Sequence, residues 1–475
     1  MTINHWINGS EHESSDGRTF DTVNPWTQSA WTDVAEAGQG EVDDAVGAAR
    51  AAFDSGPWAR MGFGERGALL HALADLIDEH IDELADADTT DMGKPLSAMK
   101  VKDVPRAAQN FRFFADHARL TAAEAYPTDS GHHAYSRYEP AGVVAAIAPW
   151  NFPLMLESWK IAPALAWGNT VVLKPAEDSP ASASILARLA TEAGFPDGVL
   201  NVVHGFGPDA AGEMLTQHGD IDRITFTGES NTGRAIAGAG ASNLVPVSLE
   251  LGGKGANIVF ADADLDEAVN WSNKAVFTNA GQVCLAGTRL IVQRSIYDEF
   301  VSRFVESASA MIVGDPRDAA TQIGPLSSRT HFEKVSGFFD DLDPAAEVLC
   351  GGVADDGSWA VHPTVIVGSP DDSRICRDEV FGPVATIAPF DTEEEAIAMA
   401  NSTKYGLNAM LFTENVRRAH RAAAALRAGT VWVNCFFVRD LRAPFGGVGW
   451  SGVGREGGNF SREFFTEPKA VVMQP

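Results

Sequence analysis

The middle of the chain alternates between short apolar runs and helical segments, and this alternation restricts the fold more than any other feature. Five apolar runs read as strands, each followed by a turn or a stretch with helical spacing; they are Val143–Ala148, Thr170–Lys174, Val199–Val203, Arg223–Phe226 and Val247–Leu251. This order is typical of parallel strands joined by helical crossovers. We therefore predict an α/β fold that binds its ligands at the carboxyl ends of the strands.

Two glycine-bearing loops follow successive strands. Gly205–Gly212 holds three glycines between a strand and a helix, and Phe226–Gly233 repeats the arrangement one unit later. Glycines let backbone amides and a helix N-terminus approach a pyrophosphate. The spacing of the first loop departs from the usual dinucleotide fingerprint, so a plain tight turn fits that loop equally well. Together the two loops favour a dinucleotide site.

A lysine and a glutamate follow the second predicted strand, in Lys174-Pro175-Ala176-Glu177. Both side chains can hydrogen-bond ribose hydroxyls, and a carboxylate beside the ribose would repel a 2′-phosphate. The motif therefore favours NAD over NADP. The alternative is a solvated pair of charges on a loop.

The flanking segments predict further elements. Residues 1–35 read as short strands and turns, residues 41–120 as helices, and residues 256–433 as a second block of strands and helices. We predict a helix at Ile161–Ala166, and another that Ser179 caps with Pro180 at its first position. Lys469–Met473 reads as a strand. Because a lone strand near a terminus tends to pair with another chain or sheet, we expect an oligomer.

Composition excludes several classes of partner. The chain has 36 Lys and Arg against 64 Asp and Glu, a formal charge of −28, which repels nucleic acid and anionic membranes. Its four cysteines are widely spaced and form no Cys/His cluster, so we expect no metal site and no disulfide framework. The N-terminus lacks a basic segment followed by an apolar one, and the longest apolar run, Ala141–Trp150, is far shorter than a membrane span. We expect a cytoplasmic protein.

Cys284 ends the stretch Asn273–Cys284, in which small and amide residues precede the thiol. A thiolate in such a setting is a candidate nucleophile. A lone cysteine is more often a small buried hydrophobe, so this interpretation depends on the rest of the chain.

Two other residues supply what a thiolate nucleophile requires. Glu250 lies in an apolar run, where burial raises its pKa and makes it a usable general base; alternatively it is a structural glutamate paired with Lys254. Asn151 lies in a turn fixed by two prolines, and an amide held rigidly suits an oxyanion hole; alternatively it bonds its own backbone. The set fits thiolate attack on a carbonyl, oxidation by NAD, and hydrolysis of a thioester.

These motifs, in this order, resemble the aldehyde dehydrogenase superfamily from Ile7-Asn8-Gly9 to Phe445-Gly446-Gly447, which is essentially the whole chain. The resemblance implies a Rossmann-like NAD-binding domain, an α/β catalytic domain and a small β oligomerisation arm. We place them at residues 1–118 with 141–252, at 253–445, and at 119–140 with 455–475. The resemblance also implies Cys284 as nucleophile, Asn151 with the Cys284 amide as oxyanion hole, and Glu250 as base.

The resemblance further implies that Lys174 and Glu177 hold the adenine ribose and that Glu379 holds the nicotinamide ribose, with Phe381 beside it. The residues that we predict to bind NAD are Ile147, Ala148, Pro149, Trp150, Lys174, Ala176, Glu177, Gly207, Phe226, Thr227, Gly228, Ser230, Leu251, Gly252, Glu379 and Phe381. One position departs from the superfamily, which usually has Ser after Phe-Thr-Gly; here it is Glu229. Because an anion facing a pyrophosphate is unfavourable, we expect Glu229 to turn away.

Three stretches resemble the branch that oxidises hydroxymuconic-type semialdehydes from aromatic ring cleavage: Phe226–Ser230, Asp103–Arg106 and Val438–Arg442. A fourth, Leu154–Lys160, looks most like the carboxymethyl-hydroxymuconate members. Such substrates carry carboxylates, and arginine binds carboxylates in a bidentate manner. We therefore predict that Arg106 and Arg442 bind the carboxylate of a 2-hydroxymuconate or 5-carboxymethyl-2-hydroxymuconate semialdehyde.

Several alternatives stay open. Arg106 could be a solvated helix charge, and Arg439 and Arg442 could form salt bridges within their loop. The enzyme could act on aliphatic or betaine-type aldehydes, or be a cysteine esterase that needs no cofactor. A homodimer and a homotetramer fit equally well.

Overall fold

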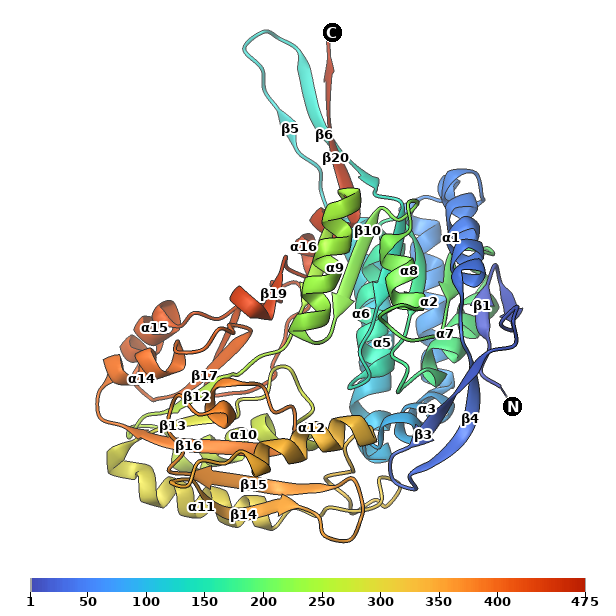
Figure 1. The fold of residues 1–475 in the computed structure, drawn as a ribbon. Helices are drawn as coiled ribbons and strands as arrows, with labels where there is room; N and C mark the ends of the chain where they lie inside the picture. Colours follow the sequence, from blue (N-terminus) through green and yellow to red (C-terminus); the bar gives the residue numbers. More distant parts are fainter. Residues whose placement is uncertain (1, 475) are drawn as a thin grey trace.

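The computed structural model describes residues 2–474, so Met1 and Pro475, which end two of the predicted domains, lie outside the described residues. Two large sheets, each with helices on both faces, form the body of the molecule, and a narrow arm projects from it (Figure 1). The arrangement is the mixed α/β fold that the strand–helix alternation predicts, which confirms the predicted fold class.

The first large sheet has eight strands in the order β19-β11-β10-β7-β8-β9-β1-β2, and its ladders from β11 to β9 are parallel. Its strands are β1 (His5–Ile7), β2 (Ser10–His12), β7 (Val143–Ile147), β8 (Thr170–Lys174), β9 (Leu200–Val202), β10 (Arg223–Thr227), β11 (Val247–Glu250) and β19 (Gly452–Val453). The helices of this half are α1 (Gln39–Asp54), α2 (Phe63–Glu79), α3 (Ile81–Met92), α4 (Leu96–Ala98), α5 (Val104–Leu120), α6 (Pro153–Ala166), α7 (Ala181–Glu192), α8 (Ala211–Gln217) and α9 (Ser230–Asn243).

Successive residues of β7 pack on opposite faces of this sheet. Val143, Ala145 and Ile147 belong to a core with α1, α8 and α9. Val144 and Ala146 belong to a core with α2, α5, α6 and α7. Because helices cover both faces, the parallel strands read as unbroken apolar runs, which explains why they could be recognised in the sequence.

The second large sheet has seven strands in the order β14-β15-β16-β13-β12-β17-β18, and only the edge pair β14–β15 is antiparallel. Its strands are β12 (Ala256–Val259), β13 (Arg289–Gln293), β14 (Glu347–Val353), β15 (Val361–Val367), β16 (Val384–Phe390), β17 (Asn408–Phe412) and β18 (Thr430–Val433). The helices of this half are α10 (Leu265–Phe277), α11 (Tyr297–Ser309), α12 (Arg329–Asp340), α13 (Arg374–Arg377), α14 (Glu393–Ala400) and α15 (Val416–Ala425).

The projecting arm is a three-stranded antiparallel sheet of β5 (Ala125–Tyr126), β6 (His133–Pro140) and β20 (Thr466–Met473), reached through α16 (Gly458–Phe465) (Figure 1). The predicted C-terminal strand therefore exists, begins three residues earlier than expected, and pairs with β6 of its own chain. A separate hairpin joins β3 (Thr19–Asn24) and β4 (Ser29–Ala35). Within residues 2–474 no helix combines the length and the apolar character that crossing a membrane requires.

Two local predictions were wrong. The helix predicted at Ile161–Ala166 is the last part of α6, which begins at Pro153. Nearly every side chain of α6 is buried, so it lacks the amphipathic period that marks a surface helix. Ser179 does not cap α7; the first helical amide, that of Ala181, donates to Asp91 of α3 at 2.9 Å. A distant carboxylate thus replaces the local cap.

High salt is expected to stabilise this protein. The formal charge of −28 makes the folded surface repel itself, and mobile cations screen that repulsion. Raising KCl from low concentration towards 1 M should therefore increase the unfolding temperature by several degrees. Calorimetry at fixed pH would measure the effect, with an equal osmolality of sorbitol as the uncharged control. An unfolding temperature that falls in KCl would contradict the expectation.

Candidate active site

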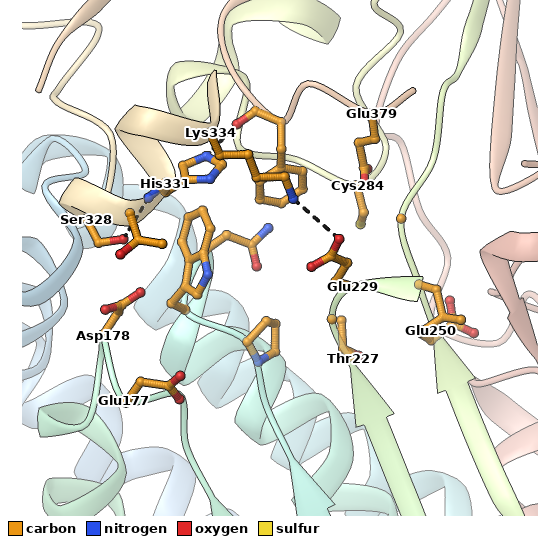
Figure 2. A pocket seen from close by; sticks show the side chains of 18 residues that line it. Glu177, Asp178, Thr227, Glu229, Glu250, Cys284, Ser328, His331, Lys334 and Glu379 are labelled. Carbon is orange, nitrogen blue, oxygen red and sulfur yellow. Dashed lines mark hydrogen bonds and ion pairs between the residues drawn. The ribbon is translucent and has the colours of Figure 1, made fainter. Parts of the chain in front are cut away.

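A cavity of about 350 Å³ lies where the first sheet faces the second. Loops after β7, β8, β10 and β11 form one side, so the cavity stands at the carboxyl ends of neighbouring parallel strands, as expected. Of the predicted residues, it is lined by Pro149, Trp150, Asn151, Glu177, Thr227, Gly228, Glu250, Leu251, Gly252, Cys284, Glu379 and Phe381 (Figure 2). Sequence reasoning assigned no cofactor role to the others: Asp178, Glu229, Ser328, Thr330, His331 and Lys334.

A strained loop presents Cys284 to this cavity. After α10 the chain passes through Asn279, Ala280 and Gly281, all with left-handed φ angles of 55°, 52° and 69°. Non-glycine residues in this region cost on the order of 1 kcal/mol or more, and such strain is often found at functional sites. A Cβ on Gly281 would meet the carbonyl oxygen of Gly382 at 2.1 Å, so only glycine fits there. The loop is therefore held in one conformation by its neighbours.

Side-chain amides connect this loop to the turn after β7. Asn151 is buried, and its Nδ2 donates to the carbonyl oxygen of Gln282 at 2.8 Å. Asn279 donates in return to the carbonyl oxygen of Asn151 at 2.8 Å. Both bonds cross between segments more than 120 residues apart, so Asn151 does not close its own turn. The network holds the Asn151 amide against the carbonyl of Gln282, which lies two residues before Cys284. An oxyanion hole formed by Asn151 and the Cys284 amide requires such a position.

Burial keeps the Cys284 thiol protonated in the free protein. Desolvation raises its pKa to about 12, and the nearby carboxylates of Glu379 and Glu250 act in the same direction. The charge of Arg439 opposes them. Because only the thiolate is nucleophilic, this thiol needs a base or an added positive charge when it reacts.

Glu250 ends β11 as a buried carboxyl group. Neither of its oxygens has a hydrogen-bond partner within the described chain, and burial, followed by the nearby Glu456, raises its pKa well above the usual value. Within residues 2–474 it forms no ion pair with Lys254, which excludes the alternative that Glu250 is a structural partner of that lysine. Figure 2 shows its carboxyl group turned away from Cys284. Gly446 leaves it room, since a Cβ there would lie 2.5 Å from Oε1.

The residues predicted to hold NAD fit such a ligand. Glu379 accepts a bond from the Gly253 amide at 2.7 Å through one oxygen only, and burial raises its pKa to about 7. A Cβ on Gly252 would lie 2.0 Å from the other oxygen of Glu379, so the backbone there is as close as glycine allows. Lys174 is buried, with Nζ bonded to the Pro175 carbonyl at 2.7 Å and 3.5 Å from Glu177.

Some predicted cofactor residues do not line the cavity itself. These are Ile147, Ala148, Lys174, Ala176, Gly207, Phe226 and Ser230. Most of them lie at or next to the ends of the strands whose loops form the cavity. A Cβ on Gly207 would meet open space, so the sheet edge that bears these residues extends past the cavity. The hydroxyl of Ser230 is already used, because it donates to the Trp450 carbonyl at 2.9 Å. It therefore does not replace the serine that the family has one position earlier.

Of the two arginines in the loop Val438–Arg442, the one that we predicted to bind substrate, Arg442, does not face the site. Arg442 is exposed and forms a bidentate ion pair with Asp440 at 2.9 and 2.6 Å, so the structure does not bring it to the site. Arg439 lies instead between the rings of Trp159 at 4.8 Å and Phe445 at 3.8 Å. Burial, followed by the charge of Arg106, lowers its pKa to about 10. The loop folds so that the first arginine of the stretch, not the second, faces inward.

Arg106 is half-buried on α5, and burial lowers its pKa. Its Nε donates to Asn110 at 3.1 Å, which in turn donates to Ser158 of α6 at 3.0 Å. It is therefore not a solvated helix charge. Neither Arg106 nor Arg439 forms an ion pair with any described residue, and Arg439 also makes no hydrogen bond there.

Comparison with known proteins finds similarity over the whole length. The model of the aldehyde dehydrogenase family matches residues 12–471. The 2-hydroxymuconic semialdehyde dehydrogenase of Pseudomonas sp. (strain CF600) is 49% identical over 99% of each chain. The mitochondrial aldehyde dehydrogenase of Homo sapiens is 45% identical over 99% of this chain and 91% of its own. The structure of an aldehyde dehydrogenase from Bacillus cereus in complex with NAD+ superposes with a TM-score of 0.98 at 42% identity, covering 100% of this chain and 97% of that one.

Proposed function

The chain belongs to the aldehyde dehydrogenase family, and on that premise we propose that its substrate is a semialdehyde that carries a carboxylate, of the kind produced when aromatic rings are cleaved. It is an NAD-dependent oxidoreductase that acts on aldehydes. Sequence identity does not select the substrate, because a 2-hydroxymuconic semialdehyde dehydrogenase and a mitochondrial aldehyde dehydrogenase are 49% and 45% identical to this chain. The choice has to come from the side chains near Cys284.

The observation that carries the proposal is a pair of half-buried cations that form no ion pair with the described chain. The charge of Arg106 acts on Arg439, and the carboxyl groups of Glu456 and Glu250 oppose it without forming an ion pair with Arg439. Arg106 forms no ion pair with a described carboxylate either. Buried charges are normally paired, because an unpaired charge loses its hydration without compensation. A substrate carboxylate would supply the missing anion, and the planar guanidinium matches it in a bidentate manner.

The two arginines also fix the direction of the substrate. Arg439 acts on the charge of Cys284, so it lies near the sulfur, yet it does not line the cavity that the cofactor residues form. The carboxylate would therefore bind on one side of Cys284 and the cofactor on the other. This arrangement leaves the aldehyde carbon of a semialdehyde at the sulfur.

In the proposed mechanism the Cys284 thiol releases its proton to water, helped by the charge of Arg439, and the sulfur forms a bond to the aldehyde carbon. The carbonyl oxygen becomes an oxyanion, which the Asn151 amide and the Cys284 backbone amide stabilise by donating hydrogen bonds. Asn151 donates to Gln282 in this structure, so the substrate oxygen would compete for that donor. Glu379, Lys174 and Glu177 would hold NAD+, whose chemistry when bound would be to accept the hydride that the aldehyde carbon loses, which leaves that carbon as a thioester of Cys284.

Glu250 acts in the second half of the reaction. Its raised pKa makes it a base strong enough to remove a proton from water. The water oxygen then bonds to the thioester carbon, the carbon–sulfur bond breaks, and the carboxylate product leaves with the Cys284 thiol regenerated. For the whole cycle, one aldehyde, one NAD+ and one water yield one carboxylate, one NADH and two protons.

The alternative substrates would not supply an anion to the two arginines. An uncharged aliphatic aldehyde would leave Arg106 and Arg439 without an anion, and a betaine-type aldehyde would bring a third cation to them. An esterase would not need Glu379, which the structure holds at the cavity through the Gly253 amide. The arginine pair therefore favours the carboxylated semialdehyde.

The experiment compares matched aldehydes. We expect kcat/KM for a semialdehyde with a terminal carboxylate to exceed that for its methyl ester by about 100-fold, a typical value for one buried charge-assisted contact. NADH absorbance measures both reactions, and omission of NAD+ should stop both. Equal kcat/KM values for acid and ester would contradict the carboxylate proposal. Turnover without NAD+ would indicate the esterase.

We also propose that the domains follow the boundaries given by the sequence and that the arm serves assembly. The outer edges of the arm sheet, on β5 and β20, have no neighbouring strand in the described chain, and Val472 and Met473 are exposed there. Such an edge invites pairing with a second copy. A homodimer or homotetramer in the cytoplasm is the assembly that we propose.

A further inference from the structure

Helix α12 reaches across the cofactor cavity from the second half of the molecule. Three residues at its start, Ser328, His331 and Lys334, line the cavity at helical spacing (Figure 2). The His331 ring packs against Trp150 at a tilt of 55°, with ring centres 4.8 Å apart, and its Nε2 bonds to the Phe381 carbonyl at 2.8 Å. Burial lowers the pKa of His331 to about 4, so it carries no charge at neutral pH.

Lys334 is consequently the only cation among the residues that line the cavity. Five carboxyl groups line the same cavity, those of Glu177, Asp178, Glu229, Glu250 and Glu379. A dinucleotide brings a further anion, its pyrophosphate, into this acidic space. The cation that it meets there has a partner already, because Lys334 Nζ lies 3.5 Å from the carboxylate of Glu229.

Glu229 occupies a position where an anion is favourable. It is the residue before α9, a helix of 14 residues, and the N-terminus of a helix attracts negative charge. Its carboxylate lines the cavity, and Figure 2 shows it directed at Lys334. The two residues come from opposite halves of the molecule, so their ion pair closes the space between α9 and α12.

We propose that Glu229 is an internal competitor of the cofactor: it neutralises Lys334 until the NAD+ pyrophosphate takes its place. Both side chains are about half exposed, at 44% for Lys334 and 56% for Glu229. Ion pairs of that exposure contribute little to folding, so this one can exchange partners easily. Its effect is to weaken cofactor binding and favour release of the spent cofactor.

The test measures NAD+ affinity by calorimetric titration of the full-length protein without aldehyde, so its result does not depend on the substrate proposal. Glu229→Gln should lower the NAD+ dissociation constant by roughly threefold to tenfold, and Lys334→Gln should raise it. In the double variant the Glu229 effect should vanish, because its target is gone. Unchanged unfolding temperatures would verify that each variant is folded.

Glu333→Gln is the matched control, because it is the same substitution next to Lys334 on α12, at a carboxylate that pairs with exposed Arg329 outside the cavity. It should leave the dissociation constant unchanged. An equal change in the Glu333 variant would show a general charge effect and overturn the proposal. Weaker or unchanged binding in Glu229→Gln would overturn it too, as would a Glu229 effect that persists without Lys334.

Discussion

Replacing Cys284 with alanine is expected to abolish NADH formation from every aldehyde, to below about 10⁻⁴ of the wild-type rate. No other described thiol lines the cavity, so none can take over the bond to the aldehyde carbon. Absorbance of NADH measures the loss, and NAD+ titration should show unchanged cofactor binding. Cys350→Ala is the matched control, because its half-buried thiol lies on β14 and contacts the Pro363 carbonyl. A Cys284 variant that still forms NADH would disprove the nucleophile.

Glu250→Gln separates the two halves of the same mechanism. Without a base for the water, we expect about one NADH per site in a rapid burst, followed by a stalled thioester that mass spectrometry detects on Cys284. Both residues act in their deprotonated forms, and the pKa of each is raised. The wild-type kcat/KM, which reports Cys284, and kcat, which reports Glu250 where hydrolysis limits turnover, should therefore both increase with pH from neutral into the alkaline range. Steady turnover without a burst in the glutamine variant would assign the base elsewhere.

The fold was predictable where the local sequence determines the environment. The central strands have covered faces, so their apolar runs were unmistakable, and β8 was predicted with its observed bounds. Helix α6 was shortened because its polar residues Glu157 and Lys160 are buried inside the fold, an environment that periodicity does not reveal. The cap of α7 comes from Asp91 in a distant helix. Such tertiary contacts cannot be inferred from neighbours in sequence.

The site was predictable to a similar extent. Cys284, Glu250 and Asn151 line one cavity because Glu250 is the last residue of β11, while Asn151 and Cys284 lie in loops that follow β7 and α10. The choice between Arg439 and Arg442 could not be made, because both flank Asp440 in a loop without a period. One available signal was overlooked: an Asp two residues before Arg442 allows a local turn with a side-chain bond, which occupies that arginine.

The substrate proposal depends on Arg439, and the contacts of this side chain predict the effect of replacing it. The guanidinium is held between Trp159 and Phe445, so its orientation is fixed before a substrate arrives. A preorganised donor loses little entropy on binding and discriminates strongly between a carboxylate and a neutral group. The same charge opposes the rise in the pKa of Cys284 and of Glu250 that burial causes. Part of the effect of a substitution will therefore be common to all substrates.

Arg439→Gln is expected to reduce kcat/KM for the carboxylated semialdehyde by about 100-fold more than for its methyl ester, a difference on the order of 3 kcal/mol. The ratio of the two kcat/KM values removes the common effect on the thiol. Arg439→Lys, which keeps the charge but not the fork, should restore part of the ratio. Arg442→Gln is the matched control three residues away, and it should leave the ratio unchanged because Asp440 already holds that side chain. An equal loss of kcat/KM for the acid and the ester, or a larger change of their ratio in the Arg442 variant, would show that Arg439 does not bind the carboxylate.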